Sequence, residues 1–359
     1  VLIIQVIQLK RSRNLNFSKS INLIYMIIQI QKGATDAEVQ NISEAVQSIG
    51  YTYNDIKTQF GRYLICIGKK EIDLRKIGFL AGVADIFKVS DAYKLTSTKW
   101  KVGKTAIDLG DGIRIGNGEF QIMAGPCSIE SEEQIVSTIE HLKANGIKIM
   151  RGGVYKPRSS PYSFRGLGMD GLILWYQLAK ENNIKIITEV MQVSQIAEMH
   201  DYVDIFQVGA RNSQNFNLLD ELGRVDKPIL LKRGMSGTIE ELLQSAEYVF
   251  SNGNEKIILC ERGIRTYETA YRNTMDINAI TILKDKSHLP VVADPSHGVG
   301  VRKYVDKIAL ASIMAGADGV IMEVHECPQK AFSDGQQTLD YRQSKDLIEK
   351  MGKARELVA

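Results

Sequence analysis

Residues 120–128 read FQIMAGPCS, an apolar run that ends in a glycine-proline turn and a cysteine. Seven further short apolar runs follow along the chain, and each of them ends in polar or charged residues. Runs of this kind, apolar throughout, are typical of parallel β-strands that are covered on both faces. We therefore predict eight strands: FQIMAG (120–125), KIMRGG (148–153), KIITEV (185–190), DIFQVG (204–209), PILLKRG (228–234), KIILCERG (256–263), PVVADPS (290–296) and GVIMEVH (319–325).

Helical segments separate these strands, and some of them begin with capping signals, such as Ser131 with Gln134 and Thr238 with Glu241. Residues 112–359 thus hold eight strand–helix units, which match the size of a (β/α)8 TIM barrel of the α/β class. A doubly wound open sheet is the alternative, but no G-x-G-x-x-G motif follows the first strand. We expect a hairpin, IRIGNGEFQIMAG (113–125), to open this domain, with Asn117 and Gly118 in its turn.

If residues 112–359 form a barrel, reactive side chains should occur at the C-terminal ends of the strands, because active sites in this fold lie there. Every predicted strand has a reactive side chain at or just after its end. These residues are Cys127, Arg151, Glu189, Gln207 followed by Arg211, Lys232 with Arg233, Glu261 with Arg262, Asp294 with His297, and Glu323 with His325.

Residues 25–90 show a different pattern, the βαββαβ order of a ferredoxin-like domain. We predict strands over 26–31, 51–57, 62–68 and 83–90, and helices over 35–50 and 71–82. Thr35 and Glu38 form a capping-box pair at the start of the first helix. The unit holds no catalytic constellation, Cys66 is expected in its core, and its size suits regulation or oligomerisation.

The remaining segments carry weaker signals. Residues 1–24 place an apolar run before a basic cluster, the reverse of a secretory signal, and fall short of the roughly 20 apolar residues of a membrane span. We expect them to be an extension outside the fold. Residues 91–111 are polar and lack periodicity, which suggests a linker. A net charge of +3 favours neither a nucleic acid nor a membrane as partner, and four scattered cysteines favour reduced thiols and a cytoplasmic location.

Cations gather at the predicted barrel mouth. Several positive side chains around one mouth repel each other unless an anion lies between them, and guanidinium groups suit phosphate and carboxylate. We therefore expect a substrate with a phosphate and more than one anionic group. The alternative is that these residues form ion pairs with Asp and Glu at the rim. The cations are Arg151, Lys156, Arg158, Arg211, Lys232 and Arg262.

A second group of strand-end and loop residues, Cys127, His297, Glu323 and Asp334, offers a thiol, an imidazole and two carboxylates. Such a borderline set suits one divalent metal ion such as Zn, Fe, Co or Mn. Cys127 could instead be a buried structural thiol, or a nucleophile with His297 as its base. In a metal-free aldolase, Lys156 or Lys232 would form a Schiff base with the substrate.

The motifs AGPCS, RGGVYKPRSSPYSFRGLG, VGARNSQNF, LLKRG, ILCERGIRTYE, DPSHGVG and IMEVH, followed by FSDG, occur in this order. Together they closely resemble 3-deoxy-D-arabino-heptulosonate 7-phosphate (DAHP) synthase, in the branch related to 3-deoxy-D-manno-octulosonate 8-phosphate synthase. The resemblance covers residues 112–359, and the ferredoxin-like unit resembles the extension of some members. KPRSSP at 156–161 favours erythrose 4-phosphate as the aldose, whereas octulosonate synthases, the alternative, typically carry KANRSS.

The resemblance implies roles for individual residues. Cys127, His297, Glu323 and Asp334 match the metal ligands, and the cysteine itself points to the metal-dependent type. Arg211 and Arg262 match contacts to the phosphate of phosphoenolpyruvate, Lys156 and Lys232 match contacts near its carboxylate, and Arg151 completes this site. Arg158 and Ser159 match the phosphate site of erythrose 4-phosphate, with Asp294 near its hydroxyls. The group that transfers each proton stays open among Lys156, Glu189 and a metal-bound water.

The reaction implied by the resemblance is an aldol-type condensation of phosphoenolpyruvate with the aldose phosphate and water, which releases phosphate. It is the first step of the shikimate pathway to aromatic amino acids. For residues 26–90 the resemblance implies inhibition by tyrosine or phenylalanine, and for the whole protein a homo-oligomer, with a tetramer favoured. The alternatives are that residues 26–90 only build an oligomer, or that the chain is an inactive sensor.

Overall fold

A computed structural model describes residues 23–157, 160 and 162–358. The predicted extension over residues 1–24 therefore lies outside the described residues, except for its last two. Contacts divide the chain into two compact units: residues up to Asp55 together with Arg62–Ser90, and Ile56–Gly61 together with the chain from Asp91 onward.

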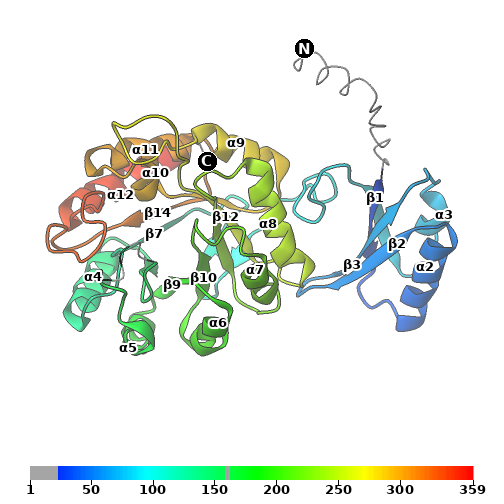
Figure 1. The fold of residues 1–359 in the computed structure, drawn as a ribbon, viewed down its shortest axis with the longest axis horizontal. Coiled ribbons are helices and arrows are strands. Elements are labelled where there is room, and N and C mark those ends of the chain that lie inside the picture. The colour runs from blue at the N-terminus through cyan, green and yellow to red at the C-terminus, as the bar shows by residue number, and fades with distance from the viewer. Residues whose placement is uncertain (1–22, 158–159, 161, 359) are drawn as a thin grey trace, which may run out of the picture. The chain divides into compact units, whose positions relative to one another are not determined.

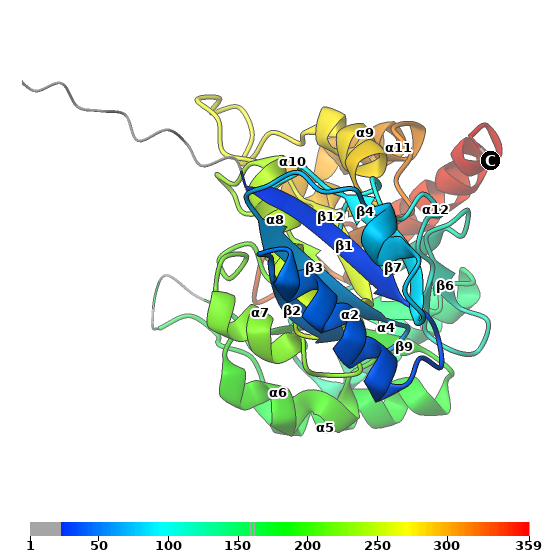
Figure 2. The same cartoon turned by 90° about the vertical axis from the view of Figure 1, so that its right-hand side faces the viewer.

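The first unit confirms the predicted βαββαβ order. Its sheet has the strand order β2-β3-β1-β4, and β1 pairs antiparallel with both β3 and β4. Helix α2 lies across one face of this sheet (Figure 2). The elements are β1 (Ile24–Ile30), α2 (Asp36–Ser48), β2 (Thr52–Lys57), β3 (Arg62–Gly68), α3 (Arg75–Gly78) and β4 (Val83–Lys88).

Helix α2 forms for the reasons seen in the sequence. Thr35 accepts a hydrogen bond from the backbone N–H of Glu38, whose carboxylate accepts from the N–H of Thr35 in return, so the capping box is present. Val39, Ile42 and Val46 recur at helical spacing and pack onto the sheet, where Cys66 is fully buried. The core role predicted for Cys66 is confirmed.

The second helix of this unit is shorter than predicted. We expected it over residues 71–82, but α3 contains four residues only. It has no side-chain cap at its start, and it ends at Gly78, a poor helix former. Phe79, next in the chain, is 85% exposed and therefore adds no buried contact that would extend the helix.

The second unit confirms the predicted barrel. Its eight strands are parallel and close on themselves, because β14 pairs with β7 through the register Gly319↔Gln121. Each strand lies within a predicted run. The strands are β7 (Gln121–Gly125), β8 (Ile149–Arg151), β9 (Lys185–Val190), β10 (Ile205–Val208), β11 (Ile229–Lys232), β12 (Ile257–Glu261), β13 (Val291–Ala293) and β14 (Gly319–Glu323).

Helices follow the strands and lie outside the ring (Figure 1). The side chains of Ser131 and Thr238 cap α4 and α8 as predicted. The helices are α4 (Glu132–Ala144), α5 (Gly168–Glu181), α6 (Val193–Met199), which continues into the short 3-10 helix η1 (His200–Tyr202), α7 (Phe216–Leu222), α8 (Ile239–Ser251), α9 (Ile277–Lys286), α10 (Pro295–Val299), α11 (Arg302–Met314) and α12 (Tyr341–Glu356). No helix in the described ranges has the length and apolar character that a membrane span requires.

The barrel interior is filled at the N-terminal end of its strands. Two short antiparallel strands, β5 (Ile107–Asp108) and β6 (Arg114–Ile115), bring Ile107, Ile113 and Ile115 against one interior side chain or more from each barrel strand. We call this cluster the apolar plug. Its other members are Met123, Ile149, Ile187, Ile205, Leu230, Ile258, Cys260, Val292 and Ile321.

The hairpin predicted over residues 113–125 does not form as expected. Strand β6 pairs with β5 and not with β7, because β8 and β14 already occupy both edges of β7. Asn117 and Gly118 do form a tight turn with positive φ values of 53° and 92°, but it joins only the isolated bridge Gly116↔Glu119.

Residues 91–111, which we interpreted as a linker, belong to the second unit. Leu95 and Trp100 are buried there, and the indole N–H of Trp100 donates to the carbonyl of Leu95 at 2.8 Å. The carboxylate of Glu247 on α8 accepts the N–H groups of Leu95 and Thr96 at 2.8 and 3.1 Å. These contacts hold the segment against the barrel although its sequence has no periodic pattern.

Candidate active site

The barrel strands place polar side chains directly above the apolar plug. On seven strands a plug residue is followed two positions later by a polar one, and residues i and i+2 of a strand lie on the same side. The polar side chains therefore enter the barrel mouth. The pairs are Ile149 and Arg151, Ile187 and Glu189, Ile205 and Gln207, Leu230 and Lys232, Cys260 and Arg262, Val292 and Asp294, and Ile321 and Glu323.

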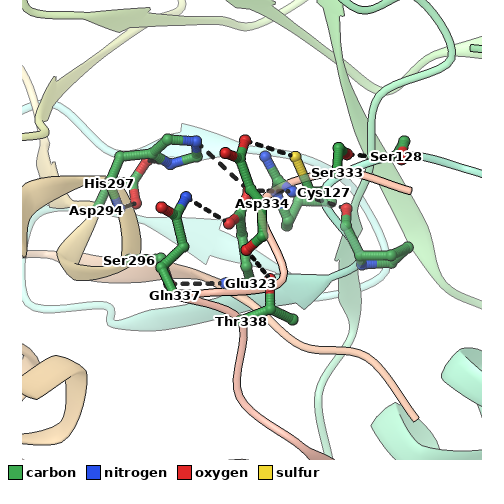
Figure 3. A network of polar contacts seen from close by, with 12 residues as sticks. Cys127, Ser128, Asp294, Ser296, His297, Glu323, Ser333, Asp334, Gln337 and Thr338 are labelled. Atoms are coloured by element: carbon green, nitrogen blue, oxygen red, sulfur yellow. Dashed lines mark hydrogen bonds and ion pairs between the residues drawn. The ribbon is translucent and has the colours of Figure 1, made fainter. Parts of the chain in front are cut away.

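Three of the four predicted metal ligands meet at this mouth. Ligand atoms of Cys127, Glu323 and Asp334 lie within 4.8 Å of one another. The Cys127 thiol donates to Oδ2 of Asp334 at 3.1 Å, and Cys127 and Glu323 are 3% and 1% exposed (Figure 3). A soft sulfur and two carboxylates converging in a buried space are a donor set that suits a borderline divalent ion.

His297, the fourth predicted ligand, lies beside this group. It stands on α10, whose N-cap residue Asp294 accepts the His297 backbone N–H at 3.0 Å. Its Nδ1 is 2.8 Å from Oδ2 of Asp294, and its Nε2 is 3.4 Å from Oε1 of Glu323 (Figure 3). A carboxylate only accepts, so Nδ1 carries a proton, and Nε2 points toward Glu323 and the rest of the cluster.

Predicted cations surround the same cluster. The Lys156 ammonium lies 3.1 Å from the Cys127 sulfur and 2.9 Å from the Cys127 carbonyl. Arg151 donates to Oε1 of Glu323 at 3.3 Å. Lys232 donates to Oδ2 of Asp294 at 2.6 Å, the same oxygen that receives Nδ1 of His297. The mouth is thus one continuous network of charges.

Burial and charge act differently on the acids of the cluster. Burial raises the pKa of the Cys127 thiol to about 12, helped by the nearby Glu323 carboxylate, so the thiol is protonated and donates. Burial would also raise the pKa of Asp334, but charge from His297, the Cys127 hydrogen bond and Arg272 hold this pKa well below its usual value. An incoming divalent cation would therefore displace the thiol proton and meet carboxylates that are already ionised.

A cavity opens next to the cluster. Arg262 in its wall is only 4% exposed, and it donates a hydrogen bond to the carbonyl of Gly263 at 3.0 Å. Among the described residues no carboxylate lies within 4.0 Å of this guanidinium, and burial lowers its pKa. A buried cation without an ionic partner indicates an anion site. The charged lining residues are Lys156, Glu189, Arg211, Lys232, Arg262, Arg272, His297 and Asp334.

Other predicted strand-end residues face away from the cavity. Arg233 donates to Glu261 at 2.8 Å and to Asp276 at 2.9 Å, and Glu261 also accepts the N–H of Gly263. For Arg233 and Glu261 the alternative prediction, an ion pair at the rim, is therefore confirmed. Their neighbours in the chain, Lys232 and Arg262, line the cavity instead.

Arg158 and Ser159, which we expected to bind the aldose phosphate, lie outside the described residues. Two other residues of the site were not predicted from the sequence. Arg272 and Gln337 were missed, although both contact the carboxylate cluster. Arg272 lies in the long loop after β12, away from any strand end, whereas Gln337 follows Asp334 by three residues and could have been considered.

Comparisons with known proteins agree with these features. Residues 99–359 match the model of the DAHP synthetase I family. A phospho-2-dehydro-3-deoxyheptonate aldolase from Thermotoga maritima is 44% identical over 91% of this chain and 97% of its own length. A 2-dehydro-3-deoxyphosphooctonate aldolase from Syntrophobacter fumaroxidans is 32% identical over 67% of this chain and 88% of its own.

Solved structures extend the likeness to three dimensions. The crystal structure of the Thermotoga maritima phospho-2-dehydro-3-deoxyheptonate aldolase (DAHP synthase) has a TM-score of 0.74 and 43% identity, and covers 93% of this chain and 98% of that one. A truncated form of the 3-deoxy-D-arabino-heptulosonate 7-phosphate synthase from the same organism has a TM-score of 0.70 and 45% identity, and covers 74% of this chain and 97% of that one. With its barrel, its cluster of thiol and carboxylates and its cationic cavity, the chain belongs to the DAHP synthetase I family.

Proposed function

We propose that this protein condenses phosphoenolpyruvate with erythrose 4-phosphate and water to give 3-deoxy-D-arabino-heptulosonate 7-phosphate and phosphate, the first step of the shikimate pathway. The observation that carries the proposal is the buried Arg262, a cation without a carboxylate partner in the described chain, in a cavity next to the cluster of Cys127, Glu323 and Asp334. One feature calls for an anion and the other for a metal. The 44% identical relative named for this product supports the same reaction.

We propose one divalent ion, of Mn, Fe, Co or Zn, as the cofactor, held by Cys127, His297, Glu323 and Asp334. When bound, such an ion supplies a Lewis acid that polarises the aldehyde of the aldose. The donor set supports this assignment, because the buried thiol of Cys127, the buried carboxylate of Glu323 and the partly exposed carboxylate of Asp334 converge within 4.8 Å of one another.

The cations of the cavity hold phosphoenolpyruvate. Arg262 and Arg211 contact its phosphate, while Lys232, Lys156 and Arg151 lie around its carboxylate. These contacts place C3 of phosphoenolpyruvate against the aldehyde carbon; water then adds at C2, and phosphate leaves by cleavage of the C–O bond. Lys156 and Glu189 line this cavity and are two of the candidates for proton transfer.

Asp294 takes a positioning role in this proposal. We expected it near the aldose hydroxyls, yet its Oδ2 already receives Lys232 at 2.6 Å and His297 at 2.8 Å. It therefore fixes the position of a predicted substrate lysine relative to that of a predicted metal ligand. Arg158 and Ser159 are retained as the proposed contacts to the aldose phosphate.

The octulosonate synthase reaction is the alternative, and one assay separates the two. Full-length protein is incubated with phosphoenolpyruvate and either erythrose 4-phosphate or arabinose 5-phosphate, with and without a chelator, and phosphate release is measured. We expect release with erythrose 4-phosphate that the chelator abolishes. Release with arabinose 5-phosphate alone, or release that the chelator leaves unchanged, would contradict the proposal.

For the ferredoxin-like unit we propose regulation by tyrosine or phenylalanine, in a protein that assembles as a homo-oligomer, with a tetramer favoured. The 44% identical relative matches over 97% of its length, so the similarity includes this unit as well as the barrel. Deletion of residues 1–90 should leave the reaction intact and remove the inhibition. Inhibition that survives the deletion would show that the effector binds elsewhere.

A further inference from the structure

In each of the two carboxylates, Asp334 and Glu323, one oxygen faces the predicted metal ligands and the other oxygen is hydrogen-bonded by a residue outside the cluster. Oδ2 of Asp334 receives the Cys127 thiol at 3.1 Å, while Oδ1 receives Nη1 of Arg272 at 3.1 Å. Oε1 of Glu323 lies 3.4 Å from Nε2 of His297 and also receives Arg151 at 3.3 Å, while Oε2 receives the Gln337 amide at 2.8 Å (Figure 3). One oxygen of each carboxylate is thus turned toward the predicted ligands, and the other is fixed from behind.

Arg272 and Gln337 are also joined to each other. Nη1 of Arg272 donates to Oε1 of Gln337 at 3.1 Å, and the same nitrogen donates to Asp334. This contact fixes the orientation of the Gln337 amide, because a flipped amide would set its NH2 against the guanidinium and its oxygen against Glu323. Arg272, Gln337, Asp334 and Glu323 therefore form a chain with one arrangement of donors and acceptors.

The backbone around Gln337 is held firmly. Gln337 is 1% exposed, and two residues later the N–H of Leu339 donates to the carbonyl of Glu323 at 3.0 Å. Asp334, three residues earlier, has a left-handed backbone with φ of 50°, which is unfavourable for a residue with a side chain. Contacts from Gln337 and Arg272 are therefore well placed to keep the Asp334 loop in this conformation.

Arg272 brings a third segment into the chain. Its backbone N–H donates to Val299 at 3.1 Å, and the neighbouring Asn273 amide donates to the carbonyl of His297 at 2.9 Å. The turn that carries His297 ends at Gly300 with φ of 67°, and a Cβ there would collide with Cβ of Arg272. The loop after β12 thus lies against the His297 turn and reaches Asp334 with its guanidinium.

We propose that Arg272 and Gln337 are positioning residues of the metal site: they hold Asp334 and Glu323 so that one oxygen of each is presented together with Cys127 and His297. The inference rests on the metal site of the proposed function. Partners that orient ligating carboxylates commonly change metal affinity by about 10- to 100-fold when they are removed. Neither residue stands at a strand end, and both act through a ligand.

The test measures metal affinity without turnover. Full-length protein is stripped with a chelator and titrated with Mn²⁺, and free Mn²⁺ is followed by electron paramagnetic resonance. Gln337→Met, which keeps the volume but loses both hydrogen bonds, and Arg272→Met should each weaken Mn²⁺ binding by about 10- to 100-fold. Arg272→Lys should recover part of the loss, because a single nitrogen, Nη1, makes both contacts. Since the two residues form one chain, the double variant should lose less than the product of the single losses.

Matched controls lie next to each residue. Gln336→Met changes an exposed neighbour of Gln337, and Arg265→Met changes an exposed arginine of the loop that carries Arg272; both should bind Mn²⁺ like the wild type. Wild-type affinity in Gln337→Met and Arg272→Met would overturn the inference. If the wild type itself bound no Mn²⁺, or if Cys127→Ser bound it equally well, the proposed metal site would fail, and the inference with it.

Discussion

The apolar plug and the barrel mouth are built by the same strands, yet they differ in every chemical respect. On β14, Ile321 packs into the plug while Glu323, two residues further, is buried among charges. On β11 the pair is Leu230 and Lys232. Residues two apart are separated by roughly 6.6 Å along a strand. An interior that is apolar in one layer therefore becomes ionic in the next.

The two layers contribute opposite terms to the free energy of folding. Burying an aliphatic side chain in the plug stabilises the protein by about 1.5–3 kcal/mol. Burying a charge at the mouth is costly, and a pair of charges recovers that cost only with good geometry. Arg262 lacks even a carboxylate partner within the described chain. Substitutions in the plug should therefore lower stability, and substitutions at the mouth should lower activity.

The largest expected contrast compares two buried cysteines. Cys127 lies at the mouth and Cys260 in the plug, at 3% and 0% exposure. Cys127→Ser removes the sulfur ligand and should abolish chelator-sensitive phosphate release while the circular dichroism spectrum stays unchanged. Cys260→Ser buries a hydroxyl at the edge of the plug, next to the charged layer, and should lower the free energy of unfolding by about 1–3 kcal/mol with turnover retained. Equal turnover in the two variants would remove the distinction between the layers.

Arg262→Met should separate activity from stability at the mouth. Loss of a charged contact to phosphate should lower kcat/KM for phosphoenolpyruvate by about 100-fold, or about 2.7 kcal/mol. The midpoint of urea unfolding should stay constant or rise, since the variant removes a buried cation that has no carboxylate partner among the described residues. Steady-state kinetics and urea titration on the same sample check both halves. A clear fall in stability would mean that Arg262 serves the fold.

Ile115→Ala should give the reverse result. The Ile115 side chain is fully buried in the plug, and neither β5 nor β6 contributes a residue to the lining of the cavity at the mouth. Truncation should lower the free energy of unfolding by about 2–4 kcal/mol and leave KM for phosphoenolpyruvate within a factor of about two. Val102→Ala, at a residue that is 86% exposed, is the control and should change neither quantity. A raised KM in Ile115→Ala would show that the plug shapes the mouth.

The sequence predicts the barrel well because each of its strands is a short, self-contained apolar run. It predicts pairing less well where the choice depends on the closed ring. Arg114–Ile115 read as half of a hairpin with β7, but closure of the ring uses both edges of β7 and leaves β6 to pair with β5. Likewise, Trp100 and Leu95 belong to a segment without periodicity, so only the folded barrel shows why they are buried.

The site follows the same division. Cys127, Glu323 and His297 could be predicted because strand ends of a barrel converge, whatever the details of packing. The strand-end pairs Lys232-Arg233 and Glu261-Arg262 could not be resolved, since the sequence does not show which member faces the cavity. Arg272 lies ten residues beyond Arg262 in a loop whose path is set by its contacts with the His297 turn. No strand periodicity reaches that far.

Two histidines that flank β13 give the smallest and most selective test of the comparison. His297 follows the strand at the mouth, whereas His288 precedes it at the other end, where it is 1% exposed. Nε2 of His288 lies 2.8 Å from the carbonyl of Leu95, and a carbonyl only accepts, so Nε2 carries the proton and Nδ1 receives the hydroxyl of Thr105 at 2.7 Å. Burial lowers the pKa of His288 from 6.5 to about 3, with the nearby charge of Lys101 acting in the same direction.

This lowered pKa makes stability depend on acid. Above pH 6.5 His288 is neutral in both the folded and the unfolded protein. Between pH 6.5 and about pH 3 His288 is protonated in the unfolded chain but stays neutral in the folded protein. As the pH is lowered through this range, the free energy of unfolding should therefore decrease by about 1.4 kcal/mol per pH unit. His288→Gln keeps a donor for Leu95 but does not titrate. Urea unfolding at pH 7.5 and 5.5 should show a loss about 1.4 kcal/mol smaller in the variant than in the wild type, and equal losses would mean that His288 is protonated in the folded barrel.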